Sequence, residues 1–522
     1  MSSRTHLGTA GERRLRGSRQ PGDPAPGRRT PGAPSRRPPA GVVLAGAALA
    51  AASLSGCGAE DTLPGRSRPI FEPGWPGPGE LALDSPTFIP GDPGEARFET
   101  PNGVRACIVS AADGPLVRLT AALPLGRLHE AEGEAGASAV LIRLLATRGA
   151  GDRNRPLSLR LAELGTSVSV EESLDAARIS LNVLPEDWRE GLELLVGLLR
   201  TPDLDAVGDD RVGPGFDMPI AGIGGDGFRP KVELERRIHG YPLAPPEPGT
   251  TVPAAAVRAL AARSLAADRV VLGIGGPVAR DQVEAALTAM TRDWAPLGPP
   301  ASEPALIAPR EVTQRLHIVE VPSLEGWIAI GRAVGAVPAS DRAALAVLRF
   351  ILAERLNIAA REMRGLANRD DFQIPDTASG TGLLLVRTGG RPEAVGPLVR
   401  YSLDEIARLH DPEDPVTEAE LTRAQGWLLG AVWQRSLELA TSASATLALE
   451  HLRHGHRDRL MEWPAAVRSV TSAEVQRIAS RYLDPAGFVT VVAGPLEAIR
   501  AARHPRWPVA LEDLEAELSG GR

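Results

Sequence analysis

The pattern of apolar and polar residues becomes that of a folded protein from about residue 103 onward. Two short stretches rich in apolar and β-branched residues, Val117–Leu123 and Ala177–Leu184, predict β-strands. Ala135–Leu145 predicts a buried helix and Trp188–Leu199 an amphipathic helix, because their apolar side chains recur at helical spacing. Strands and helices are therefore expected in the same domain.

The chain also contains an internal repeat. Val257–Val278 aligns without a gap with Val475–Leu496, at an offset of 218 residues. The identical pairs include Val257/Val475, Arg263/Arg481, Leu265/Leu483, Gly276/Gly494 and Pro277/Pro495. Each copy is typical of a helix, a short turn and a β-branched strand that stops at Gly-Pro.

A second pair of matching segments lies nearer the start of each half of the chain. Ala139–Ala146 matches Ala346–Ala353 at an offset of 207 residues, so the predicted elements occur in the same order in both halves. The predicted fold class is α+β, with two tandem homologous domains, each an antiparallel sheet covered by helices. We expect these domains at residues 96–297 and 298–510, followed by an acidic tail at 511–522.

The pattern of the N-terminal region predicts an export signal. Residues 1–40 are basic, Gly41–Ala52 is uncharged and apolar, and Leu54-Ser55-Gly56-Cys57 follows. This order is typical of a secretory signal at residues 1–56, and the last four residues resemble a bacterial lipobox with Cys57 as the lipidated residue. Residues 57–95, rich in Pro and Gly, would then form a tether between the lipid and the body. We expect an exported lipoprotein of the cell envelope, held to the membrane through this anchor.

Charge and cysteine content narrow the choice of partners. Removing residues 1–56 takes away nine arginines and two acids, which changes the net charge from −7 to −14. Nucleic acid is therefore not an expected partner, because binding it requires a basic surface. Cys107 is the only other cysteine, so an acylated Cys57 leaves no internal disulfide.

The order of these pieces over about residues 100–500 resembles the insulinase/pitrilysin-type zinc metallopeptidases, in particular the processing-peptidase branch with two tandem domains. The matching pieces include 161–165, 184–186, 240–242, 248–250 and 275–277 in the first half, and 361–366, 417–421 and 470–475 in the second. The resemblance implies a half-shell of two domains, since family members work as closed shells of four such domains around a chamber.

Active members of this family carry His-x-x-Glu-His on the first long helix. Residues i and i+4 share a helix face, so both imidazoles reach one zinc ion while the Glu serves as general base. The corresponding positions here are Ala139, Ile142 and Arg143. Alanine and isoleucine have no ligand atom, and arginine is not deprotonated to bind a metal. We therefore predict no zinc, no other cofactor and no peptidase activity.

The remaining parts of the family's site are also altered. The stretch expected to supply the third ligand, 208–215, contains Asp209 and Asp210 among glycines and a proline that would break a helix. By resemblance, Arg361 and Asn368 occupy the positions of an arginine and a tyrosine that hold the substrate backbone. The alternative for Arg361 is a surface arginine paired with Glu362 or another nearby acid.

Three further clusters carry titratable or aromatic side chains. His451, His454 and His456 predict a solvated helix end, with a divergent metal site as the alternative. His129 and the acids that follow it predict a flexible acidic loop before the first helix. Trp427 and Trp433 predict core positions rather than a binding platform.

The function that follows from these patterns is a non-catalytic partner subunit, paired with a catalytic homologue of the same family. A stand-alone scaffold or peptide-binding lipoprotein is the first alternative, and a peptidase with a relocated metal site is the second.

Overall fold

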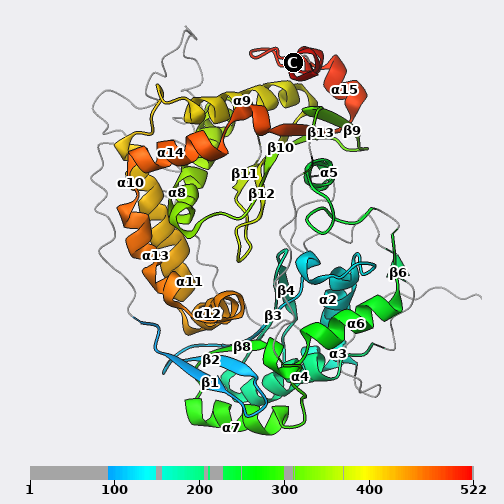
Figure 1. Cartoon of the computed structure of the whole chain (residues 1–522), viewed down its shortest axis with the longest axis vertical. Helices are drawn as coiled ribbons and strands as arrows, with labels where there is room; N and C mark the ends of the chain where they lie inside the picture. The colour runs from blue at the N-terminus through cyan, green and yellow to red at the C-terminus, as the bar shows by residue number, and fades with distance from the viewer. Residues whose placement is uncertain are drawn as a thin grey trace, which may run out of the picture. The chain divides into compact units, whose positions relative to one another are not determined.

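The computed structural model describes residues 92–147, 156–204, 210–211, 227, 229–247, 250–298, 310, 312–367 and 369–519, all within one compact unit, Leu81–Arg522. The expected signal (1–56), Cys57, nearly all of the tether and Asn368 lie outside these residues. Two sheets dominate the described part, and helices cover both of them (Figure 1). Within it, no helix combines the length and the apolar character needed to cross a membrane.

The first sheet has six strands in the order β1-β2-β8-β3-β5-β4. All neighbouring strands are antiparallel except β2 and β8, which are parallel. The strands are β1 (Glu95–Glu99), β2 (Arg105–Ser110), β3 (Val117–Leu123), β4 (Ser169–Glu172), β5 (Ala177–Val183) and β8 (Val271–Gly276). A separate two-stranded ribbon pairs β6 (Asp210–Arg211) with β7 (Thr251–Val252).

The second sheet has five strands in the order β11-β12-β10-β13-β9. Its only parallel pair among the described strands is β9 with β13. The strands are β9 (Leu316–Glu320), β10 (Gly326–Val334), β11 (Arg369–Gln373), β12 (Gly382–Gly390) and β13 (Val489–Gly494). Apart from β1, each strand of the first sheet has a counterpart here, in the same spatial order and with the same pairing direction.

The repeat seen in the sequence corresponds to matching elements. Helix α6 (Ala254–Ser264) and strand β8 lie 218 residues before helix α14 (Ser472–Tyr482) and strand β13. The short 3₁₀ turns between them, η4 (Ala267–Arg269) and η8 (Pro485–Gly487), have the same offset. The predicted α+β fold with two similar halves is therefore confirmed, with one parallel pair in each otherwise antiparallel sheet.

Each half has its own apolar core on one face of its sheet. In the first half the core lies against α2 (Ala137–Thr147), α4 (Trp188–Arg200), α6 and α7 (Arg280–Thr291), and α3 (Leu157–Glu163) lies at its margin. In the second half it lies against α8 (Ala339–Leu356), α9 (Val395–His410), α10 (Glu418–Trp427), α14 and α16 (Leu511–Ser519). Area removed from water by these side chains is the main stabilising contribution, at roughly 25 cal/mol per Å².

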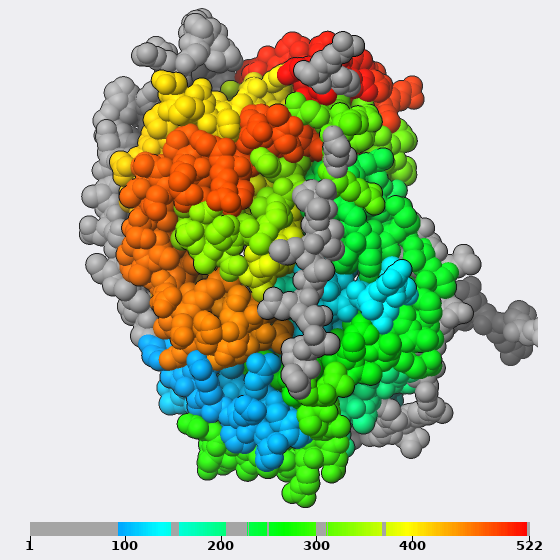
Figure 2. Space-filling model, in the orientation of Figure 1, coloured from blue at the N-terminus to red at the C-terminus, as the bar shows by residue number. Residues whose placement is uncertain are grey.

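The opposite face of each sheet is covered by a helix from the other half. Helix α12 (Ala440–His454) packs Ala443, Leu447 and Ala448 on β2, β3 and β8 of the first sheet. Helix α5 (Arg229–Ile238) packs Leu234 and Ile238 on β10 and β13 of the second sheet. Strands β8 and β13 are consequently buried on both faces. Figure 2 shows the orange surface of the α12 region directly against the blue surface of the first strands.

The other segments of the second half connect these layers. They are η5 (Asn357–Glu362), η7 (Leu428–Gln434), α11 (Arg435–Leu437), α13 (Asp458–Ser469) and α15 (Leu496–Ala501). Thr417 with Glu420, and Thr471 with Glu474, form capping boxes at the starts of α10 and α14.

Two expectations about this region differ from the structure. Residues 511–519, expected within an acidic tail, form helix α16, because Leu511, Leu514 and Leu518 pack into the second core. Trp433 is buried as expected, but Trp427 is 52% exposed, and its ring centroid lies 5.7 Å from that of Phe350.

Candidate functional site

Helix α2 is the helix to which the resemblance assigns the positions of the zinc motif. Ile142 is buried in the first core, Ala139 is half-buried and Arg143 is exposed. Ala139 and Arg143, four residues apart, lie on the face where two histidines would be needed. Neither side chain can bind a metal ion at neutral pH, and their assignment to the motif positions rests on the resemblance.

A buried carboxylate, Glu130, holds the start of α2. It accepts hydrogen bonds from the backbone N–H of Gly136 (3.0 Å) and of Ser138 (2.7 Å), and from the hydroxyl groups of Ser138 (2.5 Å) and Tyr241. A carboxylate at this position satisfies N–H groups that a helix leaves unpaired at its start and favours the positive end of the helix dipole. Burial raises the pKa of Glu130, although the hydrogen bonds from Ser138 and Gly136 oppose the rise.

The segment before α2 is therefore not the flexible acidic loop that its glycines predicted. Glu130 and Glu134 are both buried, and Glu134 pairs with Arg263 of α6. The Arg263 guanidinium also donates to the backbone carbonyl of His129 (3.1 Å). The carboxylate that caps α2 precedes the helix by more than the usual capping spacing, so no local sequence pattern predicted this role.

The stretch expected to supply a third metal ligand is only partly described. Its residues 210–211 form strand β6, which pairs with β7. No helix is therefore present at these two residues, as the glycines and proline around them predicted.

Arg361 lies at the surface on the π-helical segment η5, directly after α8. Its side chain is 54% exposed, and its Nε lies 3.7 Å from Oε1 of Glu362, which is also exposed. This pair matches the surface alternative, while the exposed guanidinium also remains accessible to a carboxylate or carbonyl of another molecule. Asn368, its expected companion, lies outside the described residues.

Two homologous hairpins meet between the halves. Arg453 of α12 donates to Asp175 (2.8 Å), in the turn between β4 and β5, and to Asp376 (2.9 Å), in the loop between β11 and β12. The Asp175 carboxylate also accepts the backbone N–H of Ala378 (2.6 Å). The Arg453 side chain is only 9% exposed, so its pair with Asp175 is buried, whereas Asp376 is exposed.

A second junction joins α12 to the first two strands. His451 Nε2 lies 2.8 Å from Glu95 Oε1, and Cys107 also hydrogen-bonds Glu95. These three side chains are the only group of His, Cys, Asp or Glu within the described residues whose atoms lie close enough to share a metal ion. Burial opposes ionisation of Glu95, but hydrogen bonds from His451 and Cys107 lower the pKa of its carboxyl below the usual value.

The charges around this junction favour an ion-pair network over a metal. Glu95 Oε2 lies 3.3 Å from the Nε of Arg457 and 3.5 Å from the Nε of Arg97, so two guanidinium groups already balance the carboxylate. Burial and the adjacent Glu95 raise the pKa of the Cys107 thiol, which opposes the thiolate that a metal needs.

The other two histidines of the predicted cluster do not join His451. His454 Nε2 contacts Arg459, and His456 faces Asp458 at 3.4 Å. Burial and then the Arg459, Arg342 and Arg453 guanidinium groups lower the pKa of His454 to about 4. The predicted helix end is correct, because α12 ends at His454 and Gly455 follows with φ of 74°. The solvated character is not, since His451 is 6% exposed.

Comparisons with known proteins agree with this architecture. Residues 251–426 match the model of the Peptidase M16 inactive domain. A peptidase M16 inactive domain from Pseudomonas fluorescens has a similar structure, with a TM-score of 0.64 and 21% identity, covering 79% of this chain and 99% of that one. A protease from Helicobacter pylori is similar with a TM-score of 0.59 and 16% identity, covering 77% of this chain and 99% of that one. A search of curated proteins found no match.

The structural likenesses establish the fold, and the family match covers the part of the chain from β7 to α10. The matched segment includes the stretch of chain that connects the two halves, and strands β9 to β12 of the second sheet. The resemblance inferred from the sequence is thereby supported: residues 251–426 of this chain are similar to the inactive domain of the insulinase-like M16 peptidases, and its fold is theirs.

Proposed function

We propose that this chain is a non-catalytic partner subunit that completes the chamber of a catalytic M16 homologue in the cell envelope. The proposal is carried by helix α2: the resemblance assigns the positions of the zinc-binding histidines to Ala139 and Arg143, and neither side chain offers a metal ligand. A chain with the family's two-domain fold and without its metal ligands retains the family's surfaces for assembly and for binding peptides.

The segment around Arg361 supports a contact with another chain. Ile358 and Met363, on or next to η5, are each 42% exposed and flank the exposed Arg361 guanidinium. Exposed apolar side chains beside an arginine are typical of protein interfaces, in which arginine pairs with carboxylates or carbonyl groups. A stable interface of this kind would bury more than about 1,000 Å² in total.

Affinity purification of the full chain from its native envelope tests the assembly. We expect a co-purifying homologue with an intact His-x-x-Glu-His motif. Arg361→Ala should leave the complex intact and lower its peptide turnover, whereas Arg468→Ala, an exposed arginine on α13, should have no effect. A monomer without a co-purifying homologue would instead favour a stand-alone scaffold or peptide-binding lipoprotein. Turnover that ignores Arg361→Ala would remove this side chain from the active site.

The proposed location depends on Cys57. A chain acylated at Cys57 would reach the membrane through its lipid, and Cys57→Ser should yield a soluble or unprocessed protein. Mass spectrometry of the native N-terminus tests this directly. An unmodified Cys57 within a longer N-terminal segment would contradict the anchor.

A further inference from the structure

The second sheet lacks a strand that the first sheet has. In the first sheet, β1 pairs antiparallel with the outer edge of β2, whereas β9, the counterpart of β2, is the last described strand of its sheet. The registers with β8 and β13 place Ala106, Cys107 and Ile108 of β2 at the positions of Leu316, His317 and Ile318 of β9. The pairing of β1 with β2 in the first sheet therefore indicates what kind of strand the edge of β9 can bind.

The backbone of β9 presents hydrogen-bonding groups along this edge. The Arg315 carbonyl accepts from Thr490 N–H (2.7 Å), and Val321 N–H donates to the Gly494 carbonyl (3.0 Å), so odd-numbered residues face β13. Backbone groups of Leu316 and Ile318 consequently point the other way, because successive residues of a strand alternate in direction. Within the part of the chain that the structure describes, the Ile318 N–H and C=O have no hydrogen-bond partner.

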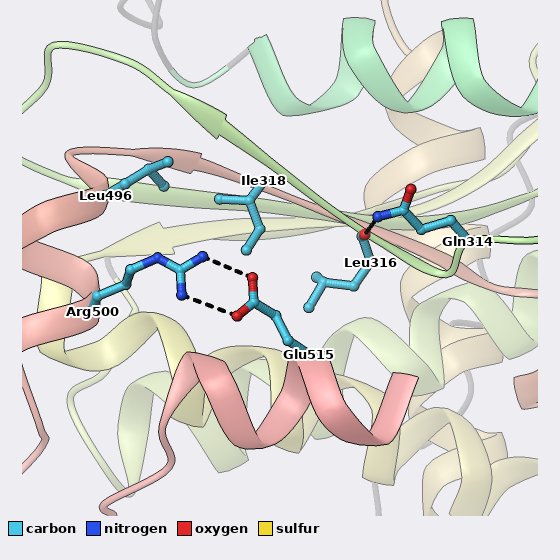
Figure 3. A pocket seen from close by; sticks show the side chains of 6 residues that line it. All are labelled: Gln314, Leu316, Ile318, Leu496, Arg500 and Glu515. Carbon is cyan, nitrogen blue, oxygen red and sulfur yellow. Dashed lines mark hydrogen bonds and ion pairs between the residues drawn. The ribbon is translucent and has the colours of Figure 1, made fainter. Parts of the chain in front are cut away.

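One group on this edge is already occupied by a side chain. The amide of Gln314 donates to the carbonyl of Leu316 at 2.9 Å (Figure 3). Gln314 is exposed, so its amide can leave this carbonyl without breaking a buried contact. A strand added to the edge would take its place.

A pocket adjoins the same edge. It has a volume of about 480 Å³ and is lined by Leu316 and Ile318 of β9, Leu496 and Arg500 of α15, Glu515 of α16, and Gln314. Arg500 and Glu515 form a two-point ion pair at 2.8 and 3.0 Å across its wall (Figure 3). The alternate residues of β9 therefore point into a space that can receive side chains from a neighbouring strand.

We propose that the edge of β9 binds an extended segment of another polypeptide, which adds to the second sheet as an antiparallel strand. Such strand addition takes its affinity from main-chain hydrogen bonds and its specificity from pockets for alternate side chains. The edge exists whether or not the chain pairs with a catalytic homologue.

The strand that fills the equivalent edge of the first sheet indicates the ligand's sequence. In β1, Ala96 lies opposite Ile108 and Phe98 opposite Ala106, and both side chains pack against the first core. A ligand on β9 would accordingly place a small apolar residue opposite Ile318 and a larger one opposite Leu316, in the pocket. Its middle residue would lie opposite His317, whose Nε2 is buried and has no hydrogen-bond partner among the described residues, so a polar residue fits there.

A labelled peptide with the sequence of residues 93–101 is the probe, measured by fluorescence anisotropy against the chain from residue 57 onward with Cys57→Ser. We expect saturable binding that weakens at least about tenfold when the Ala and Phe of the peptide are both replaced by Ser. Ile318→Pro, which removes the outward N–H, should weaken binding by a similar factor. Gln314→Ala should preserve or tighten it, because a competing donor is removed.

Two further measurements guard against false conclusions. Leu496→Trp should also weaken binding at least about tenfold, by filling the pocket, and replaces Ile318→Pro if that variant does not fold. Hydrogen exchange should show peptide-dependent protection at 316–320 and none at 169–172 of β4. Absence of binding, binding unaffected by these variants, or faster exchange in β1, which would indicate that the peptide displaces it, would each overturn the proposal. Protection of the outward Ile318 N–H without peptide would do so as well, because this edge would then already be filled.

Discussion

A Cβ atom on Gly275 of β8 would lie 2.0 Å from the backbone carbonyl oxygen of Ala440 in α12. The neighbouring Gly273 has a similar relation to Ser444, at 2.4 Å from its carbonyl oxygen. The helix of the second half thus approaches the first sheet so closely that two alternate positions of β8 have room only for hydrogen. The two glycines of the sequence Gly-Ile-Gly therefore permit the close contact between the halves.

Gly275→Ala should therefore destabilise the protein. Overpacking costs about 1–3 kcal/mol in typical cores, and a clash with backbone atoms cannot be relieved by a side-chain rotation. Denaturant unfolding measures the change. Gly426→Ala is the matched control, because nothing lies within 4 Å of its added Cβ in helix α10, and it should be neutral or stabilising by up to about 1 kcal/mol. Equal effects of the two substitutions would contradict the close approach.

Removing the Asp175 carboxylate should weaken the junction of the two hairpins. Asp175→Ala leaves the buried Arg453 with one partner fewer and removes the acceptor of Ala378 N–H, and losing one member of a buried pair costs about 3–5 kcal/mol. Glu284→Ala, which removes an exposed pair with Arg280 on α7, should cost at most about 1 kcal/mol. A loss for Asp175→Ala no larger than that of Glu284→Ala would show that the junction adds little to stability.

Cys107 should be unreactive in the folded protein. Its thiol is buried, and burial together with Glu95 raises its pKa, so little thiolate is present at neutral pH. In a Cys57→Ser chain, iodoacetamide at pH 8 should leave Cys107 unmodified until a denaturant is added, as mass spectrometry would show. Rapid alkylation of the native protein would mean that the junction of β1, β2 and α12 opens readily.

His454 should make stability depend on pH. Its pKa is lowered to about 4 from the usual 6.5, so between these values the unfolded chain binds a proton that the folded chain does not. Stability contributed by the neutral imidazole is present above about pH 6.5 and is lost as the pH falls toward 4. The free energy of unfolding, measured across this range, should fall less steeply in His454→Gln. An unchanged slope would show that His454 titrates normally.

The sequence predicted the repeated elements well because two copies of one pattern reinforce each other. Helix α6 and strand β8, like α14 and β13, appear where the offset of 218 residues placed them. Contacts between distant segments were not predictable in the same way. Glu95 and His451 are 356 residues apart, and no local pattern marks them as partners.

Burial was the property that residue type alone described least well. Glu130 belongs to a polar segment, yet hydrogen bonds at the start of α2 hold it inside the protein. Trp427 is apolar and aromatic, yet half of its surface is exposed, although its ring centroid lies 5.7 Å from that of Phe350. Such cases depend on how layers of the fold overlap, which periodicity does not specify.

The proposed loss of zinc ligands from α2 also yields a prediction about restoring activity. Placing His, Glu and His at Ala139, Ile142 and Arg143 should not by itself create peptidase activity, since residues 210–211 form a strand where the third ligand's helix is expected. Peptide hydrolysis by this triple variant measures the outcome. Robust chelator-sensitive activity would mean that another side chain completes the site.

Elemental analysis of the purified mature chain, combined with a peptidase assay with and without a chelator, tests most directly whether this protein is non-catalytic. We predict well under one zinc ion per chain and no peptide hydrolysis that a chelator abolishes, because neither Ala139 nor Arg143 offers a ligand on α2. One zinc ion per chain together with chelator-sensitive hydrolysis would contradict the account and would favour a peptidase with a relocated metal site.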